Sequence, residues 1–160
     1  MAFSQFKKLV DNKLKFVFFL LAKLPSAYLC GVRVVQIDEG SVTTSVPYKW
    51  LSQNPFRSIY FACQAMAAEM STGLLAMGHT YQLHPPVSML VTKLEAGFTK
   101  KASERIYFTC SDGDAIKQTI QKAVDTGVGQ TITAISVGRT KAGEEVGRFA
   151  IEWSFKVRKV

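Results

Sequence analysis

One segment near the middle of the chain constrains the fold most. Residues 58–77 are rich in Ala, Met, Leu, Gln and Glu, and β-branched side chains are almost absent from them. This composition predicts a long central helix over residues 58–78, with Ser58 as its N-cap and Gly78 as its C-terminal stop. Because the helix is apolar almost all the way round, other parts of the protein must enclose it on most sides.

The remaining sequence predicts strands that can enclose this helix. Two β-rich stretches, 31–37 and 41–46, flank an acidic glycine turn and are expected to pair as a hairpin. Four further strands are expected at 87–99, 105–111, 130–140 and 144–158, with a short amphipathic helix at 114–124 capped by Asp112 or Asp114. The order predicts an α+β fold in which an antiparallel sheet of about six strands curls around the central helix.

A second helix is expected before the strands. Residues 4–24 have a helical pattern and Pro25 follows them, so an N-terminal helix within residues 1–25 is predicted. The apolar part, residues 14–24, is about half the ~20 residues that a membrane-spanning helix needs. Packing over the sheet or against a partner subunit is favoured over contact with a membrane surface. The 160 residues fit one domain that covers 1–160.

Composition narrows the possible partners. The net charge is +8, but the basic residues are scattered and form no aromatic-interleaved stripe, so nucleic acid is not expected as a partner. The three cysteines, Cys30, Cys63 and Cys110, are odd in number and widely spaced, which argues against a disulfide framework or a zinc site. With no signal peptide recognisable, the chain is expected in the cytoplasm, without metal or cofactor.

A single carboxylate stands out on the central helix. Glu69 is the only acidic residue between Glu39 and Glu95, and most residues on its face of the helix are small. A buried carboxylate pairs with a partner or raises its pKa, and a carboxylate in such a place can act as a general base. The alternative is a structural role, in which Glu69 binds a loop backbone or a basic strand residue such as Lys93.

The start of the same helix offers a second feature. Backbone amides at Tyr60, Phe61 and Ala62 fall in the first helical turn, where unpaired donors favour negative charge and can polarise a carbonyl oxygen. Phe61 and Glu69 are eight residues apart, or about 12 Å along a helix axis. One carbonyl cannot contact both within a chain. Two antiparallel copies of the helix across a dyad would bring them together, so a joint catalytic role predicts a dimer.

The residues around this helix resemble a known family. The run Asn54-Pro55-Phe56-Arg57-Ser58-Ile59-Tyr60-Phe61-Ala62, followed by Ala67-Ala68-Glu69-Met70, is similar to the central-helix segment of hotdog-fold thioesterases. The likeness covers about residues 30–158 and is nearest to an uncharacterised bacterial branch close to the phenylacetate-pathway and hydroxybenzoyl-CoA enzymes. It implies a hotdog fold and an acyl-CoA thioesterase, a hydrolase that works as a homodimer or as a tetramer of such dimers.

The resemblance also implies roles for individual residues. Asn54 would position substrate or water, the Phe61 amide would hold the thioester oxygen, and Glu69 of the partner chain would activate water or attack directly. The substrate-binding residues implied around them are Ser58, Tyr60, Ala62, Thr72 and Arg57. The CoA phosphates would meet basic strand and loop residues, for which the candidates are Arg57, Lys100, Lys101, Arg139 and Lys141.

The sequence also departs from the family pattern. The family's His-Gly-Gly positions read Tyr60-Phe61-Ala62, and the threonine often found four residues after the acid is Gly73, with Thr72 beside it. These changes favour an alternative function, a hotdog protein that binds an acyl or lipid-like ligand without catalysis. A Cys63 nucleophile is disfavoured because both histidines, His79 and His84, lie beyond the far end of the helix.

Overall fold

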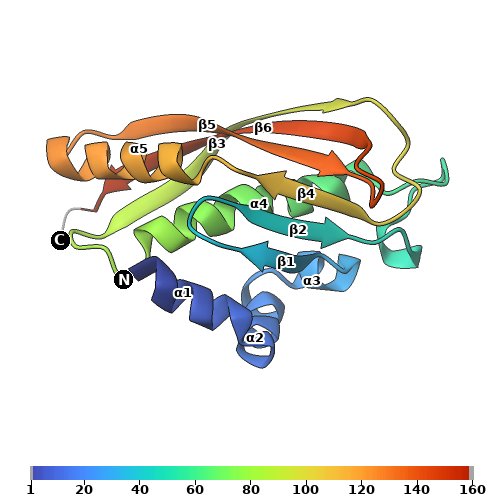
Figure 1. Ribbon diagram of the computed structural model, residues 1–160, viewed down its shortest axis with the longest axis horizontal. Coiled ribbons are helices and arrows are strands. Elements are labelled where there is room, and N and C mark those ends of the chain that lie inside the picture. Colours follow the sequence, from blue (N-terminus) through green and yellow to red (C-terminus); the bar gives the residue numbers. More distant parts are fainter. Residues whose placement is uncertain (1, 159–160) are drawn as a thin grey trace.

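The computed structural model describes residues 2–158 and has a single antiparallel sheet curved over one long helix (Figure 1). Six strands lie in the order β1-β2-β4-β5-β6-β3. Their bounds are β1 Arg33–Ile37, β2 Val42–Val46, β3 Val87–Phe98, β4 Ile106–Cys110, β5 Gln130–Arg139 and β6 Glu145–Val157. The prediction of an α+β fold, with a hairpin before the central helix and four strands after it, is confirmed.

The central helix, α4 (Phe61–Thr80), lies against the concave face of the sheet. Its sheet-facing residues are fully buried, and they include Ala67, Ala68, Leu75 and Ala76. Two polar contacts fix the helix on the sheet: Thr44 Oγ1 donates to the Ala67 carbonyl at 2.7 Å, and the Ser71 and Ser136 hydroxyls lie 2.8 Å apart. Small helix residues allow this close approach of helix and sheet.

The central helix was predicted to begin at residue 58, but its first helical residue is Phe61. Tyr60, not Ser58, is the N-cap of α4, and the helix continues past Gly78 to Thr80. The Ser58 amide and hydroxyl both donate to the side chain of Asn54, which keeps Ser58 in the preceding loop. Gly78 is needed for close packing instead, because a Cβ there would lie 2.3 Å from the Phe3 ring.

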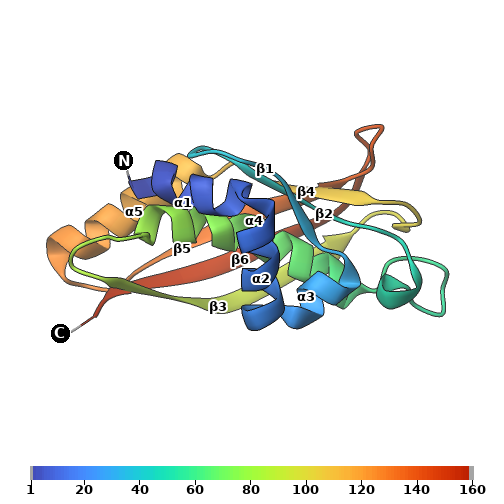
Figure 2. The same cartoon turned by 90° about the horizontal axis from the view of Figure 1, so that it is seen from below.

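The predicted N-terminal helix is also corrected. It is divided into α1 (Ala2–Asp11) and α2 (Lys13–Lys23), because the Asn12 side chain accepts a hydrogen bond from the Lys15 amide and starts a new helix. As predicted, the helical stretch ends just before Pro25, at Lys23, and Pro25 then begins the short α3 (Pro25–Cys30). Seen from below, α1 runs alongside the C-terminal part of α4, and α2 lies across α4 (Figure 2). Among residues 2–158, no helix is both long and apolar enough to span a membrane.

The two edges of the sheet differ. At the β1 edge, Lys7 of α1 donates to the Ile37 carbonyl at 2.6 Å. At the other edge, β3 pairs with β6 from Val87 to Phe98, and its other side faces solvent. Large apolar side chains of β3 are exposed, with Leu90 65% and Phe98 48% accessible. A long strand with an open, apolar edge is typical of a surface that pairs with another strand.

The remaining helix, α5 (Gly113–Thr126), packs over the end of α4 and beside β5. Asp112 occupies its N-cap position; the sequence had left this position open between Asp112 and Asp114. The Asp112 carboxylate accepts from the Ile135 amide of β5 at 2.7 Å and makes no capping hydrogen bond. The residue therefore joins the helix start to the sheet.

Candidate active site

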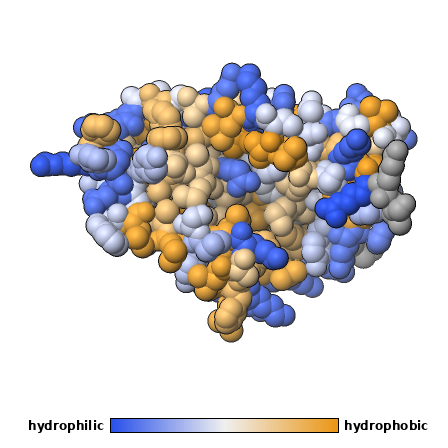
Figure 3. Space-filling model, turned by 180° about the vertical axis from the view of Figure 1, so that it is seen from behind, coloured by the Kyte–Doolittle hydropathy of each residue, from blue (hydrophilic) through white to orange (hydrophobic). Residues whose placement is uncertain are grey.

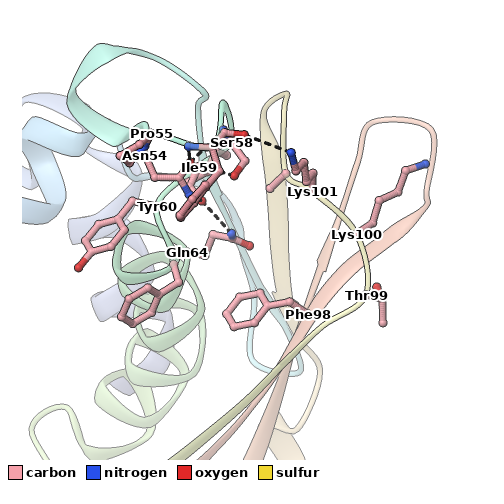
Figure 4. A pocket seen from close by; sticks show the side chains of 13 residues that line it. Asn54, Pro55, Ser58, Ile59, Tyr60, Gln64, Phe98, Thr99, Lys100 and Lys101 are labelled. Atoms are coloured by element: carbon pink, nitrogen blue, oxygen red, sulfur yellow. Dashed lines mark hydrogen bonds between the residues drawn. The ribbon is translucent and has the colours of Figure 1, made fainter.

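Two separate cavities flank α4, and each contains part of the predicted site. The first, of 610 Å³, lies at the start of α4 between the preceding loop and the end of β3 (Figure 4). The second, of 520 Å³, lies between the C-terminal half of α4, α2 and the strands β3 and β6. They share no lining residue, so a single subunit does not bring Phe61 and Glu69 into one cavity.

Asn54 organises the loop at the first cavity. Its Oδ1 accepts from the Phe56 amide at 3.0 Å, the Ser58 amide at 3.2 Å and the Ser58 hydroxyl at 3.1 Å. Within residues 2–158, the Nδ2 group makes a single long contact, 3.5 Å to the Ile59 carbonyl. Asn54 thus lines the cavity with its oxygen committed to the loop and one amide proton free to donate.

The first turn of α4 presents unpaired backbone donors. The Tyr60 amide is already used, because it donates to the Ser52 carbonyl at 2.8 Å. Among residues 2–158, no acceptor is present for the amides of Phe61 and Ala62. The Phe61 side chain is 58% exposed and stacks edge-on against Tyr60 at 4.9 Å. Of the three predicted backbone donors, the amides of Phe61 and Ala62 therefore stay available, next to an aromatic side chain.

Gln64 belongs to the same cavity and was not predicted from the sequence. Only 5% of the residue is exposed, and its Nε2 donates to the Ile59 carbonyl at 3.2 Å. No partner for its Oε1 is present in the described part of the chain. A glutamine in a helix is common, and the sequence carried no signal that this one would be buried with an unpaired oxygen.

Glu69 lies at the second cavity, whose wall is mostly apolar but also includes Lys23, Thr80 and Arg158. A narrow extension of this cavity brings Phe16 and Leu20 of α2 over the same residue. The cavity wall also contains Phe19, Met77, Val87, Met89 and Trp153. A Cβ at Gly73 would lie 3.1 Å from Glu69 Oε1 and 3.3 Å from the Trp153 ring, so the carboxylate rests over a glycine and an indole edge.

The Glu69 carboxylate has no partner within residues 2–158. No hydrogen bond or ion pair to it is formed, and Lys93, the expected structural partner, binds Glu95 at 2.9 Å instead. Burial raises the pKa of the Glu69 carboxyl above its ordinary value, because desolvation disfavours the charged form. A partly buried, unpaired acid with a raised pKa is suited to accept a proton near neutral pH.

The other predicted binding residues differ in position. Ser58 and Tyr60 line the first cavity, whereas Arg57 and Ala62 do not. Arg57 sits in the loop with a left-handed φ of 59°. Thr72 is fully buried: it donates to the Glu69 carbonyl and accepts from Trp153 Nε1, both at 3.0 Å. The expectation that Thr72 touches substrate is therefore corrected, because its hydroxyl is used inside the subunit.

The predicted phosphate-binding residues are also partly engaged. Lys100 and Lys101 border the first cavity; Lys100 pairs with Glu144 at 2.6 Å and Lys101 donates to the Phe56 carbonyl at 3.3 Å. Arg139 pairs with Glu145 at 3.0 Å, away from that cavity. Of the five candidates, Lys100 and Lys101 line this cavity, whereas Arg57, Arg139 and Lys141 do not.

Cys63 lies next to Cys30, with the two sulfurs 3.5 Å apart and both thiols free. Burial raises the pKa of the Cys63 thiol to about 12, and the neighbouring thiol adds to this effect. A thiol with such a pKa is not a nucleophile at neutral pH. The exclusion of Cys63 as a catalytic residue is thereby supported.

The side of the molecule opposite the sheet is strongly apolar. Seen from behind, hydrophobic side chains gather around a central hollow (Figure 3). This is the side on which the sheet does not cover α4. Both cavities are bounded by α4 and β3, the elements that would meet a second subunit placed on this side.

Known proteins were compared with this chain by sequence and by structure. The family model of the domain of unknown function DUF4442 matches residues 13–155. No functionally curated protein matches the chain in sequence.

Three solved structures illustrate the similarity in fold. The protein of unknown function PA5026 from Pseudomonas aeruginosa, a "probable thioesterase", has a TM-score of 0.73 at 18% identity, with 99% of this chain and 97% of that chain covered. The protein OLEI01261 of unknown function from Chlorobaculum tepidum has a TM-score of 0.75 at 14% identity, with 91% and 94% covered. The thioesterase HI1161 from Haemophilus influenzae has a TM-score of 0.60 at 9% identity, with 87% and 88% covered.

At these identities the comparison concerns the fold alone. The similarity extends over nearly the whole length of each chain, including the helix enclosed by the curved sheet. The chain has the hotdog fold, and it belongs to the DUF4442 family.

Proposed function

We propose that the protein is an acyl-CoA thioesterase that hydrolyses a thioester to a free acid and CoA at a site shared by two subunits. The observation that carries this proposal is the Glu69 carboxylate, which lies at a largely apolar cavity and has no hydrogen-bond or ion-pair partner among residues 2–158 of its own subunit. Leaving a partly buried acid unpaired costs stability, so a role in chemistry explains the position better than a structural role does. Within the hotdog thioesterases, we place this protein near the phenylacetate-pathway and hydroxybenzoyl-CoA enzymes.

The open edge of the sheet supports a homodimer. Antiparallel pairing of β3 with its copy would cover the exposed apolar side chains of that strand, Leu90, Leu94 and Phe98. The same dyad would set two copies of α4 side by side and antiparallel. Glu69 of one subunit would then face the free amides at Phe61 of the other, which the separate cavities of one subunit do not allow.

The proposed reaction uses these groups in sequence. The Phe61 amide donates to the thioester oxygen, and Asn54 Nδ2 holds the substrate or the attacking water. Glu69 of the partner subunit takes a proton from water as the oxygen attacks the carbonyl carbon. The carbon–sulfur bond then breaks, and the proton on Glu69 passes to the leaving thiolate.

The two cavities accommodate different parts of the substrate. The cavity beside Glu69 suits the acyl group, because most of its wall is made of aliphatic and aromatic side chains, with Lys23, Thr80 and Arg158 as the other polar lining residues. The first cavity has Lys100 and Lys101 at its mouth, where their charges can meet the CoA phosphates. The substrate thus crosses from one subunit's helix start to the other subunit's acid.

The direct test compares wild type with Glu69→Gln on a panel of acyl-CoA thioesters, with the released thiol as the readout. We expect Glu69→Gln to lower kcat at least roughly a hundredfold, because the general base is lost while the shape is kept. Glu104→Gln is the matched control, since it removes the same charge from an exposed loop position. Equal activity of Glu69→Gln and wild type would refute the proposal.

A second function is favoured by one observation. The Phe61 side chain stands where related enzymes have glycine, and it is 58% exposed beside the free amide. A protein in which this ring blocks the carbonyl would bind an acyl ligand without hydrolysing it. The same panel distinguishes the two functions, because a binding protein would be stabilised against unfolding by the thioesters while releasing no thiol.

A further inference from the structure

The buried amide of Gln64 is the most unusual polar group outside the proposed chemistry. The residue is 5% exposed, and its Oε1 has no hydrogen-bond partner in the part of the chain that the structure describes. Its orientation is fixed by the other half of the amide, since Nε2 donates to the Ile59 carbonyl at 3.2 Å. Reversing the amide would set two oxygens against each other. The unpaired group is therefore an acceptor.

Two side-chain amides converge on the Ile59 carbonyl, and their oxygens differ. Asn54 Nδ2 approaches this carbonyl at 3.5 Å and Gln64 Nε2 at 3.2 Å. The Asn54 oxygen accepts three hydrogen bonds within its own loop. The Gln64 oxygen accepts none. Of these two amides at the helix start, only Gln64 has an acceptor left for a ligand.

An unpaired acceptor in such a place selects the chemistry of its ligand. Leaving a buried oxygen without a donor costs about 1–3 kcal/mol, which a ligand N–H or O–H would recover. A carbonyl or carboxylate of the ligand would be repelled at the same point. The oxygen therefore favours a ligand group that carries a hydrogen-bond donor.

The surroundings of Gln64 fit a flexible chain with amide groups. The side chain points into the first cavity, between the start of α4 and Phe98 of β3 (Figure 4). Phe98 is held in place by an edge contact with Phe149 at 5.6 Å. Gly147 on β6 lets the Phe98 ring pack close to this strand, since a Cβ at position 147 would lie 3.3 Å from that ring and 3.8 Å from Gln64 Oε1. The cavity continues to Lys100 and Lys101 at its mouth.

We propose that the first cavity binds the pantetheine arm of the substrate, and that Gln64 Oε1 accepts a hydrogen bond from one of its amide N–H groups. This inference rests on the proposed function, because it assumes a thioester whose oxygen lies at the Phe61 amide. The cysteamine amide follows the thioester sulfur by two carbons, so it reaches the residue one turn along the helix. Gln64 thereby distinguishes pantetheine thioesters from thioesters of simple thiols.

Binding of unreactive probes tests this inference without catalysis. S-octyl-N-acetylcysteamine is a thioether that cannot be hydrolysed, and it retains the amide N–H. In 2-(octylthio)ethyl acetate, an ester oxygen replaces that N–H. In the N-methyl derivative of the first probe, a methyl group replaces the amide hydrogen. We expect wild type to bind the first probe roughly tenfold more tightly than either of the others in calorimetric titration.

The variant Gln64→Met keeps the length of the side chain and removes its oxygen. We expect it to bind the amide and ester probes within about twofold of each other. Should this variant fail to fold, the three probes on wild type still decide the question. Equal affinity of wild type for all three probes would overturn the inference, and it is also the result expected if a buried water satisfies Gln64 Oε1. Failure of wild type to bind any of the probes would overturn it as well.

These outcomes separate the inference from the proposed function. Discrimination between the probes without turnover of acyl-CoA would uphold the Gln64 contact and remove the catalytic proposal. Turnover of acyl-CoA by a wild-type protein that does not distinguish the probes would uphold the thioesterase and remove the Gln64 contact.

Discussion

The chemistry of this protein depends on how single side chains are paired. Glu69 stood out in the sequence because no other acid occurs between Glu39 and Glu95, and among the described residues it has no partner at its largely apolar cavity. Gln64 could not be found in the same way, because only the packed structure reveals that its oxygen is buried and unpaired. Ser58 was misplaced as an N-cap because Asn54 competes for its amide and hydroxyl.

The raised pKa of Glu69 predicts an unusual dependence of stability on pH. The folded protein keeps the Glu69 proton at pH values where the unfolded chain has released it, so this residue lowers the free energy of unfolding as pH rises from the ordinary carboxyl pKa to the raised one. We expect Glu69→Gln to be more stable than wild type above that range, by about 1 kcal/mol, and equal to it below.

Urea unfolding of wild type, Glu69→Gln and the control Glu104→Gln across pH 4 to 8 measures this difference. The control variant should follow wild type at every pH, because its carboxyl is exposed. A Glu69→Gln variant that is less stable than wild type at high pH would indicate that the carboxylate has a stabilising partner.

A second residue-scale prediction concerns the thiol of Cys63. Its pKa of about 12 and its 4% exposure predict that iodoacetamide does not modify it in the folded protein at pH 8. Peptide mass spectrometry before and after unfolding in urea provides the measurement, and the unfolded chain should be modified at all three cysteines. Rapid modification of Cys63 in the native protein would show that α4 opens near its start.

At the scale of helices and strands, sequence patterns predicted the type and order of elements but not their ends. The central helix and the strands were recognisable because residue type and alternation change sharply along the chain. The break at Asn12 was missed, because it depends on one side chain capping the Lys15 amide inside an otherwise helical stretch. The consequence is that α2 turns across α4 and covers Glu69.

A matched pair of substitutions in α2 tests this arrangement. Leu20 is 1% exposed on the inner face of the helix, whereas Phe18 is 63% exposed on its outer face. We expect Leu20→Ala to lower the free energy of unfolding by about 2–4 kcal/mol and Phe18→Ala to change it by about 0.5 kcal/mol or less. Urea unfolding measures both, and similar effects of the two substitutions would contradict the packing of α2 described here.

At the scale of the whole molecule, the question is whether one subunit contains a complete site. Phe61 and Glu69 are too far apart along the helix to contact one substrate carbonyl within a single chain, as the sequence predicted. The structure places the two residues in different cavities. The open β3 edge, which no residue pattern had singled out, supplies the surface on which two subunits would pair. We therefore predict a dimer in which each of the two sites contains residues from both chains.

Complementation between two inactive variants tests the shared site most directly. Glu69→Gln removes the acid, and Phe61→Pro removes the amide donor at the first position of α4, where proline is tolerated. Phe61→Ala, which keeps the amide, is the control for loss of the ring. Each of the two variants alone should be nearly inactive.

The decisive measurement is the thioesterase activity of an equimolar mixture of Glu69→Gln and Phe61→Pro, unfolded and refolded together. Half of the dimers formed at random are hybrids, and each hybrid has one site with both groups intact, so we expect recovery of about a quarter of wild-type activity. A mixture that stays as inactive as its components would contradict a site built from the acid of one subunit and the amide of the other.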